Sequence, residues 1–346
     1  MSRAPERLAA ALALAACGCH GVALQRHEIA RQPIAFIFHS ESEARERAEA
    51  HARLALPGTS RTRGEPSVLH LNSLRDHLEA ALGLRDADPI PGRLALLDPR
   101  SGRVTPLASA QRGAIPLAWS ADRDRLLFAQ RDRGTLQLFE LDLESQVVSQ
   151  RTIGPDHHPQ GCYGPDGRLV VVIAKRAPRG STPTARASLV SQLALMHADG
   201  SFAAISPGPM DGDPSCSSDG ASVAYARSFA RADSEIWLHS FELGRPEHAL
   251  APGREPAFSP DGEWIAYTRS EKIPPTLWRI RRDGSGRSRL GWGSGSAEYG
   301  PAFSPDGALV VYESQAGDRY RLSVRRFDGT GDSVLLADGD GTHAVW

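Results

Sequence analysis

This 346-residue sequence contains repeats, and one position of the aligned repeats, here called a column, has the polar side-chain types of a metal or ligand site. Gln160, Asp213 and Glu255 stand six residues before repeated aspartates, and His343 holds the matching position in a last, composite repeat. Imidazoles and carboxylates bind Zn²⁺, so His158, Asp213, Glu255 and His343 make one metal hypothesis. Each of these residues precedes the first strand of a repeat, a position that is typical of a solvated rim. We therefore predict a polar binding surface without a metal.

The motifs of common catalytic sites are absent from the sequence. Residues 291–296, Gly-Trp-Gly-Ser-Gly-Ser, are rich in glycine and serine, but neither serine has the spacing of a Gly-x-Ser-x-Gly nucleophile elbow. No Walker loop, His-Glu-x-x-His zinc motif or calcium-loop pattern occurs. We therefore assign no catalytic residue and no cofactor, and we favour a protein that binds without catalysis.

The repeated aspartates themselves have the surroundings of a tight turn. They are Asp122, Asp166, Asp219, Asp261 and Asp306, and the clearest segments read Phe-Ser-Pro-Asp-Gly. Proline presets the backbone of such a turn, aspartate caps its N–H groups, and glycine accepts a positive φ. We therefore interpret these aspartates as turn caps rather than as a ring of catalytic carboxylates.

Apolar columns flank these turns at constant distances. Positions four and six residues after each aspartate are apolar or aromatic, and residues two apart lie on one face of a strand. A third strand follows in every repeat, and pairs such as Asp199-Gly200 and Asp283-Gly284 mark a hairpin to a fourth. Four antiparallel strands in repeats of about 40–45 residues predict the blades of a β-propeller.

The two ends of the chain are expected to complete one blade together. Residues 33–38 fit the second strand of a repeat, residues 94–107 fit the third and fourth, and residues 343–346 fit the first. This arrangement predicts an all-β, six-bladed propeller of four-stranded antiparallel blades over residues 33–346. Seven blades are the alternative.

Residues 39–92 interrupt the repeat pattern. Segments 41–54 and 73–84 have helical spacing, and 67–71 is a short apolar run that could form a strand. We interpret the region as a small α-containing insertion in the composite blade, with a separate α/β subdomain as the alternative.

The first 17 residues have the pattern of a secretory signal. A charged start precedes the apolar run Leu8 to Ala16, which is too short to span a bilayer. The run ends Leu-Ala-Ala-Cys, which resembles the lipobox of bacterial lipoproteins with Cys17 as the acylated residue. An ordinary signal cleaved after a small residue is the alternative. We expect residues 18–32 to form a linker and the protein to be a periplasmic or outer-membrane-associated lipoprotein.

Two further features could carry chemistry. Cys162 and Cys216 fall in the first strands of adjacent repeats, in columns that point to opposite faces of a strand. We therefore expect two separate buried thiols rather than a disulfide.

The longest repeat spacing contains a loop over residues 175–186, which is compatible with a binding loop or with a solvated insertion. Its candidate binding residues are Arg176, Arg179 and Arg186.

Residues 256–267, Pro-Ala-Phe-Ser-Pro-Asp-Gly-Glu-Trp-Ile-Ala-Tyr, closely resemble the TolB-like, WD-like propeller repeat. Residues 301–312 match it nearly as well, and the resemblance covers residues 94–346. TolB proteins are periplasmic, carry a six-bladed propeller behind an α/β domain, and bind the lipoprotein Pal and colicins. The same repeat also precedes the hydrolase domain of prolyl oligopeptidase-type enzymes. The resemblance therefore implies a propeller of the bacterial envelope.

These observations predict a monomeric envelope propeller that binds a protein or glycan partner through its channel mouth and loops. The alternative is a propeller enzyme of lactonase, lyase or quinoprotein type with an active site in the channel. A buried cluster of histidines and carboxylates would favour the enzyme. The formal net charge of −1 gives no positive electrostatic field that would attract nucleic acid. We expect membrane association only through the lipid on Cys17.

Overall fold

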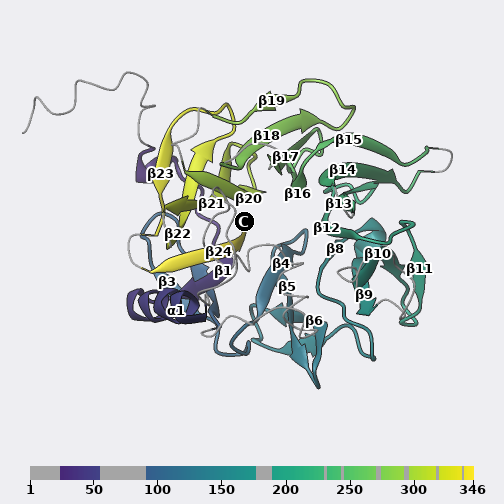
Figure 1. Cartoon of the computed structure of the whole chain (residues 1–346), viewed down its shortest axis with the longest axis horizontal. Helices are drawn as coiled ribbons and strands as arrows, with labels where there is room; N and C mark the ends of the chain where they lie inside the picture. Colours follow the sequence, from purple (N-terminus) through teal and green to yellow (C-terminus); the bar gives the residue numbers. More distant parts are fainter. Residues whose placement is uncertain are drawn as a thin grey trace, which may run out of the picture.

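The computed structural model describes residues 24–54, 91–176, 189–229, 232–242, 245–269, 274–291, 296–316, 319–336 and 339–346. These residues form six four-stranded antiparallel sheets that surround a central axis (Figure 1). The predicted fold class, a six-bladed β-propeller, is confirmed.

Within each blade, the strands run in order from the channel outward. Blade 1 contains β24 (Asp340–Val345), β1 (Ile34–His39), β2 (Arg93–Leu97) and β3 (Val104–Pro106). Blade 2 contains β4 (Ile115–Trp119), β5 (Arg125–Asp132), β6 (Thr135–Asp142) and β7 (Val148–Gln150). Blade 3 contains β8 (Gly161–Tyr163), β9 (Leu169–Arg176), β10 (Leu189–Met196) and β11 (Phe202–Ala204).

The remaining blades follow the same pattern. Blade 4 contains β12 (Asp211–Cys216), β13 (Ser222–Phe229), β14 (Ala232–Ser240) and β15 (His248–Pro252). Blade 5 contains β16 (Arg254–Phe258), β17 (Trp264–Arg269), β18 (Thr276–Arg281) and β19 (Ser288–Arg289). Blade 6 contains β20 (Ala297–Phe303), β21 (Leu309–Ala316), β22 (Arg319–Arg326) and β23 (Asp332–Val334). The helical segments are η1 (Arg26–Glu28), α1 (Glu41–Leu54) and η2 (Pro165–Gly167).

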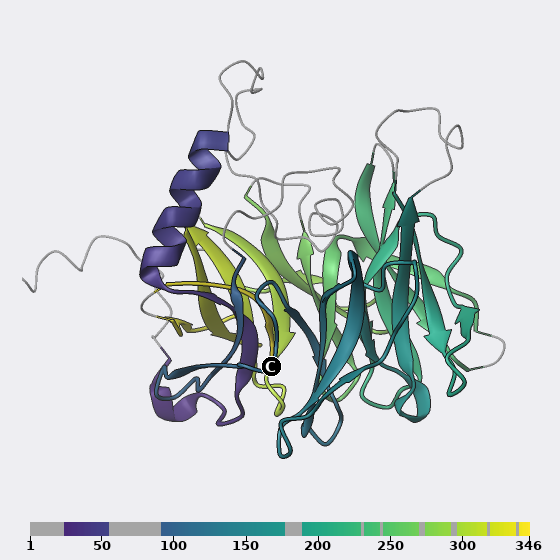
Figure 2. The ribbon, with the colours of Figure 1, turned by 90° about the horizontal axis from the view of Figure 1, so that it is seen from below.

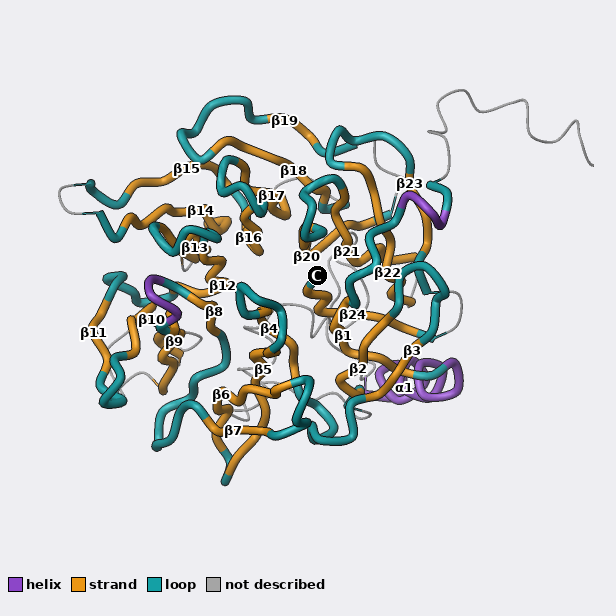
Figure 3. Tube along the Cα trace, turned by 180° about the vertical axis from the view of Figure 1, so that it is seen from behind, coloured by secondary structure: helices purple, strands orange, loops and turns teal. Residues whose placement is uncertain are grey.

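A serine and an aspartate hold the turn between the first two strands of most blades. In blade 6, Ser304 Oγ donates to Asp306 Oδ1 at 2.5 Å and accepts the N–H of Leu309 at 2.9 Å. Blades 2, 4 and 5 make the same serine–aspartate bond. In blade 2, Arg123 stands where the other turns have glycine and adopts a φ of 62°. These bonds agree with the interpretation of the aspartates as turn caps; the turns are visible from behind in Figure 3.

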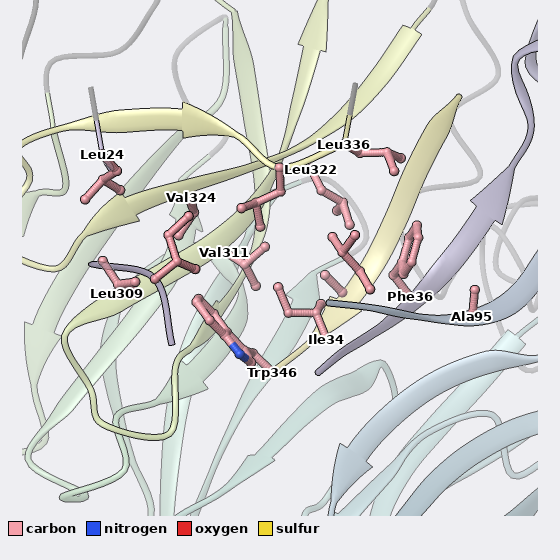
Figure 4. Close-up of a cluster of buried hydrophobic side chains, with 14 residues drawn as sticks. Leu24, Ile34, Phe36, Ala95, Leu309, Val311, Leu322, Val324, Leu336 and Trp346 are labelled. Carbon is pink, nitrogen blue, oxygen red and sulfur yellow. The ribbon is translucent and has the colours of Figure 1, made fainter. Parts of the chain in front are cut away.

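The first and last parts of the chain meet in blade 1. Strand β24 pairs with β1, with Ala35 opposite Val345 and His39 opposite Asp340. Trp346 is 6% exposed and its Nε1 donates to the Gln32 carbonyl at 2.9 Å. Figure 4 shows its ring among apolar side chains from both ends of the chain. The ring of blades is thus closed by hydrogen bonds and by one apolar core.

Helix α1 lies beside the ring and rises above one face of it (Figure 2). Ser40 caps the helix, because its N–H donates to Glu43 Oε2 at 3.0 Å while the Glu43 N–H donates back to Ser40 Oγ. Arg319 fastens the helix to blade 6, with bonds of 2.7 Å to Glu41 and 2.8 Å to Asp340. The second predicted helix (73–84) and the short strand (67–71) lie outside the described residues. Among the residues that the structure describes, no helix is long and apolar enough to cross a membrane.

The two interior cysteines form a disulfide, so the prediction of separate thiols is wrong. Cys162 of β8 and Cys216 of β12 are bonded, with their Cα atoms 5.7 Å apart. The error lies in the argument from strand faces. Adjacent blades of a propeller stack face against face, so the lower face of one blade meets the upper face of the next. Side chains on opposite faces of neighbouring blades therefore point toward each other.

Buried arginines strengthen blades 4 and 6. Arg325 is 0% exposed and donates to Glu298 and to Asp332, each at 2.7 Å. The ring of Tyr312 lies 4.8 Å from its guanidinium carbon. A comparable network in blade 4 joins Arg227, Asp211, Glu247 and Tyr225. A buried charge needs such partners, so both networks serve the scaffold.

Candidate functional site

The inner strands share a β-bulge close to where they begin. Asp213, Glu255, Gly300 and His343 all lie at breaks in the pairing between the first two strands of their blades. Their φ values are 52°, 54°, 53° and 53°, in the left-handed region. A bulge inserts one extra residue and redirects its neighbours, and bulges are common at barrel rims and beside active sites. Apart from Gln160, the polar column therefore consists of equivalent bulge residues around one mouth of the channel.

The bulge residues are linked from blade to blade by hydrogen bonds. The Asp213 N–H donates to Gln160 Oε1 at 2.8 Å, and Gln160 Nε2 donates to Asp213 Oδ1 at 2.7 Å. The Glu255 N–H lies 3.4 Å from Asp213 Oδ2. The Gly300 N–H donates to Glu255 Oε2 at 2.9 Å. Each bulge N–H is thus received by a side chain of the preceding blade.

In blade 6 the bulge residue is glycine, and Glu313 of β21 provides the acceptor in its place. Gly300 has no side chain to receive the next N–H, and Glu313 Oε1 accepts that of His343 at 2.5 Å instead. A Cβ on Gly300 would lie 3.4 Å from the same oxygen. The series ends at blade 2, because Pro116 has no N–H to donate. We call this set of residues the mouth belt: Gln160, Asp213, Glu255, Gly300, Glu313 and His343.

Two polar atoms at the mouth belt are buried without a hydrogen-bond partner among the described residues. They are Glu313 Oε2 and Arg254 Nε. Glu313 is 2% exposed, whereas Arg254 is half-buried and lies 3.7 Å from the Glu255 carboxylate. Buried polar atoms in native proteins nearly always have a partner. These two atoms therefore mark a place where a water or ligand atom is expected.

Burial raises the pKa of Glu313 to about 8. The nearby carboxylate of Glu255 adds to this rise, while the His343 N–H and the guanidinium groups of Arg47 and Arg254 oppose it. Burial and the charge of Glu255 also raise the pKa of Asp213. The channel mouth therefore contains carboxyl groups that retain a proton at higher pH than usual.

We expect Glu313 to make the protein less stable as pH rises. Its pKa is about 8 when folded and about 4.5 when unfolded, so between these values the folded state holds one more proton. Its contribution to the free energy of unfolding is complete below pH 4.5 and falls by about 1.4 kcal/mol per pH unit up to pH 8. Urea unfolding of the wild type and of Glu313→Gln between pH 5 and 9 measures this. A stability difference between the two proteins that does not change with pH would contradict the assignment.

The structure brings part of the predicted site together. Gln160 bonds to Asp213 and Asp213 to Glu255, whereas His343 bonds to Glu313 instead. Gln160 is 8% exposed, so the expected solvated rim is wrong at this position. His158 lies elsewhere in blade 3, stacked on Phe202 and 3.1 Å from Gln137. Arg176 ends strand β9 and is exposed, whereas Arg179 and Arg186 lie outside the described residues, as does Cys17.

Sequence reasoning missed Glu313 and Arg254. Glu313 stands seven residues after its repeat aspartate, in a column that holds Ala129, Ile173, Ala226 and Thr268 in the other blades. A carboxylate in this mostly apolar column is a signal that could have been found. Arg254 directly precedes a column residue but has no counterpart in the other repeats. Among the described residues, no three histidine, cysteine, aspartate or glutamate side chains are grouped so that they could hold a metal ion.

Comparison with known proteins gives matches in structure only. No protein-family model matches the chain, and no curated protein does. TolB from Acinetobacter baumannii superposes with a TM-score of 0.62 at 15% identity, over 91% of this chain and 66% of that one. A putative TolB from Agrobacterium tumefaciens has a TM-score of 0.57 at 22% identity, over 71% and 89%.

An enzyme shares the fold as well. Hydrazine synthase of Kuenenia stuttgartiensis has a TM-score of 0.64 at 12% identity, over 91% of this chain and 46% of that one. The chain thus spans less than two thirds of the length of the Acinetobacter TolB and about half of the synthase chain. Likeness at this level of identity concerns the fold. The chain has the six-bladed propeller fold of the TolB structures.

Proposed function

We propose that this protein is a non-catalytic binding propeller of the bacterial cell envelope, which engages a protein or glycan partner through its channel mouth. One observation carries the proposal: Glu313 Oε2 is buried at the mouth belt without a hydrogen-bond partner, and Arg254 Nε, buried nearby, makes only an ion pair of 3.7 Å with Glu255. Leaving such a group unsatisfied costs about 1–3 kcal/mol. A partner that donates to or accepts from these atoms recovers that free energy. The channel mouth thus offers polar atoms without hydrogen bonds to a polar group of the partner.

The hydrogen bonds of the mouth belt favour binding over catalysis. Asp213 and Glu255 each accept one backbone N–H and one side-chain donor, which engages both oxygens of Asp213 and Oε2 of Glu255 in structural hydrogen bonds. A general base needs a free lone pair within reach of the substrate. Two observations favour an enzyme of lactonase, lyase or quinoprotein type. Asp213 and Glu313, whose pKa values burial raises, lie in the same belt as His343, and a carboxyl group that is protonated at neutral pH, such as that of Glu313, can act as an acid.

The proposed location rests on the N-terminal signal and on the disulfide. Disulfides persist in the periplasm and are rare in the bacterial cytosol. In this proposal Cys17 carries the lipid, the chain acts as a monomer in the periplasm or at the outer membrane, and the arginines of loop 175–186 provide a second contact. Labelled palmitate that enters the wild type and the Cys17→Ser protein equally would refute the anchor.

Arg254→Gln tests the binding role. The substitution removes Nε and its ion pair with Glu255 while leaving the hydrogen bonds of the mouth belt in place, so we expect recovery of the partner from solubilised envelope to fall at least tenfold. Arg103→Gln, at an exposed arginine in blade 1, is the matched control and should recover the partner fully. Digestion of the captured material with protease or with a glycan hydrolase tells the two partner classes apart. Equal recovery by Arg254→Gln and the wild type would refute the proposal.

A further inference from the structure

A second binding region lies between blades 4 and 5, on the face of the ring opposite the mouth belt. It is a cleft of about 420 Å³, within the range of about 300–1,000 Å³ that small-molecule sites occupy. Strands β12 and β16 run from the mouth to the turns beside this cleft, which places the two sites on opposite faces of the ring. The lining residues used below are Leu238, Arg245, Pro246, Glu263, Arg281 and Arg282.

The arginines of the cleft are held in place by neighbouring groups. Arg282 of blade 5 reaches across to blade 4, where Nη1 lies 3.2 Å from Asp219 Oδ2 and Nη2 donates to Ser222 Oγ at 2.6 Å. The guanidinium carbon of Arg281 lies 4.4 Å from the centre of the Trp264 ring. Guanidinium groups fixed in this way lose little entropy when they bind a carboxylate through two parallel hydrogen bonds.

The arginines of the cleft are matched by acids, and one of these acids has no partner. Arg245, Arg281 and Arg282 line the cleft together with Asp283 and Glu263. Two of these arginines already pair with acids beside the cleft, Arg282 with Asp219 and Arg245 with Glu242 at 2.9 Å. Asp283 caps its own turn by accepting the Ser285 N–H at 2.8 Å, a bond that helps hold its pKa low. The carboxylate of Glu263 makes no hydrogen bond or ion pair with the described residues. The cleft therefore offers the Arg281 guanidinium, which makes no ion pair with the described residues, as a donor for an anion. Close by, Glu263 offers a free acceptor for hydroxyl groups.

We propose that this cleft binds a sugar acid, a ligand with one carboxylate and several adjacent hydroxyls. Its carboxylate pairs with Arg281 and replaces the exposed carboxylate of Glu242 on Arg245. Its hydroxyls donate to Glu263. Leu238 and Pro246 supply apolar surface for the C–H groups of the sugar ring. A simple inorganic anion would meet the same arginines but would be repelled by Glu263, so the acid makes the site selective. This inference does not depend on the proposed role of the mouth belt.

Isothermal titration calorimetry with D-glucuronate, D-glucose and inorganic phosphate tests the assignment. We expect glucuronate to bind, glucose not to bind, and phosphate to bind at least tenfold more weakly than glucuronate. The double variant Arg245→Gln/Arg281→Gln should bind glucuronate at least tenfold more weakly. Arg287→Gln, at an exposed arginine outside the cleft, should bind it as the wild type does. Arg282 is left intact because it joins two blades.

Glu263→Ala separates a sugar-acid site from a general anion site. Removing the carboxylate should weaken glucuronate binding and strengthen phosphate binding, since repulsion is lost together with the hydroxyl acceptor. Phosphate binding as tight as that of glucuronate, or a Glu263→Ala protein that binds both more tightly, would overturn the sugar-acid assignment. Absence of glucuronate binding, or unchanged binding by the double variant, would overturn the site.

Discussion

Replacing Trp346 with alanine should lower the free energy of unfolding by about 3–5 kcal/mol. The indole ring is buried between the two ends of the chain, in one cluster with Ile34, Leu309 and Val311 (Figure 4). Its loss leaves a cavity where β24 packs against blade 6, and it removes the hydrogen bond to Gln32. Because β24 is the inner strand of blade 1, the substitution weakens the contact that closes the ring.

Urea unfolding followed by circular dichroism measures this loss. Trp346→Phe is the matched control, since it keeps most of the apolar ring and gives up only the N–H donor, at a cost of about 1 kcal/mol. A Trp346→Ala protein within about 1 kcal/mol of the wild type would show that closure depends on backbone pairing between β1 and β24 rather than on the apolar core.

The fold could be predicted because each blade repeats the same local pattern. Turn residues around Asp261 and Asp306 fix the hairpins, and apolar columns such as Ile265 and Tyr267 fix the buried faces. Both depend on positions a few residues apart in the chain. The inner strand of blade 1 comes from the end of the chain, far from the other strands of its blade. It could be placed because the repeat requires an inner strand beside Ile34 to His39.

The candidate site could be predicted only in part, because its bonds run between blades. The column of Gln160, Asp213, Glu255 and His343 is visible in the sequence, but the acceptance of each bulge N–H by the preceding blade is not. Pro214, Pro256 and Pro301, which follow three of the bulge residues, were a usable sign, since proline within a sheet is found at bulges. The partnership of Glu313 with His343 depends on how the last blade meets the first, which no local pattern encodes.

The disulfide between Cys162 and Cys216 should contribute about 4 kcal/mol to stability. The bond joins residues 54 apart in sequence, and a loop of that length loses about this much free energy from the entropy of the unfolded chain. Urea unfolding with and without a thiol reductant measures the effect. We expect the unfolding midpoint of the wild type to fall in reductant, whereas that of Cys162→Ala/Cys216→Ala should not change. The double variant also controls for any effect of reductant on Cys17 and Cys19.

The same bond bears on the mouth belt, because it joins the two inner strands where the belt begins. Cys162 follows Gln160 by two residues, and Cys216 follows Asp213 by three. Cleaving the disulfide frees blade 3 to move relative to blade 4, so the paired bonds between Gln160 and Asp213 should open more often. Hydrogen exchange of the Asp213 amide should therefore quicken in reductant, while that of Gly300, two blades away, changes little. Equal exchange of the Asp213 amide in the oxidised and reduced protein would show that the belt holds these blades together without the disulfide.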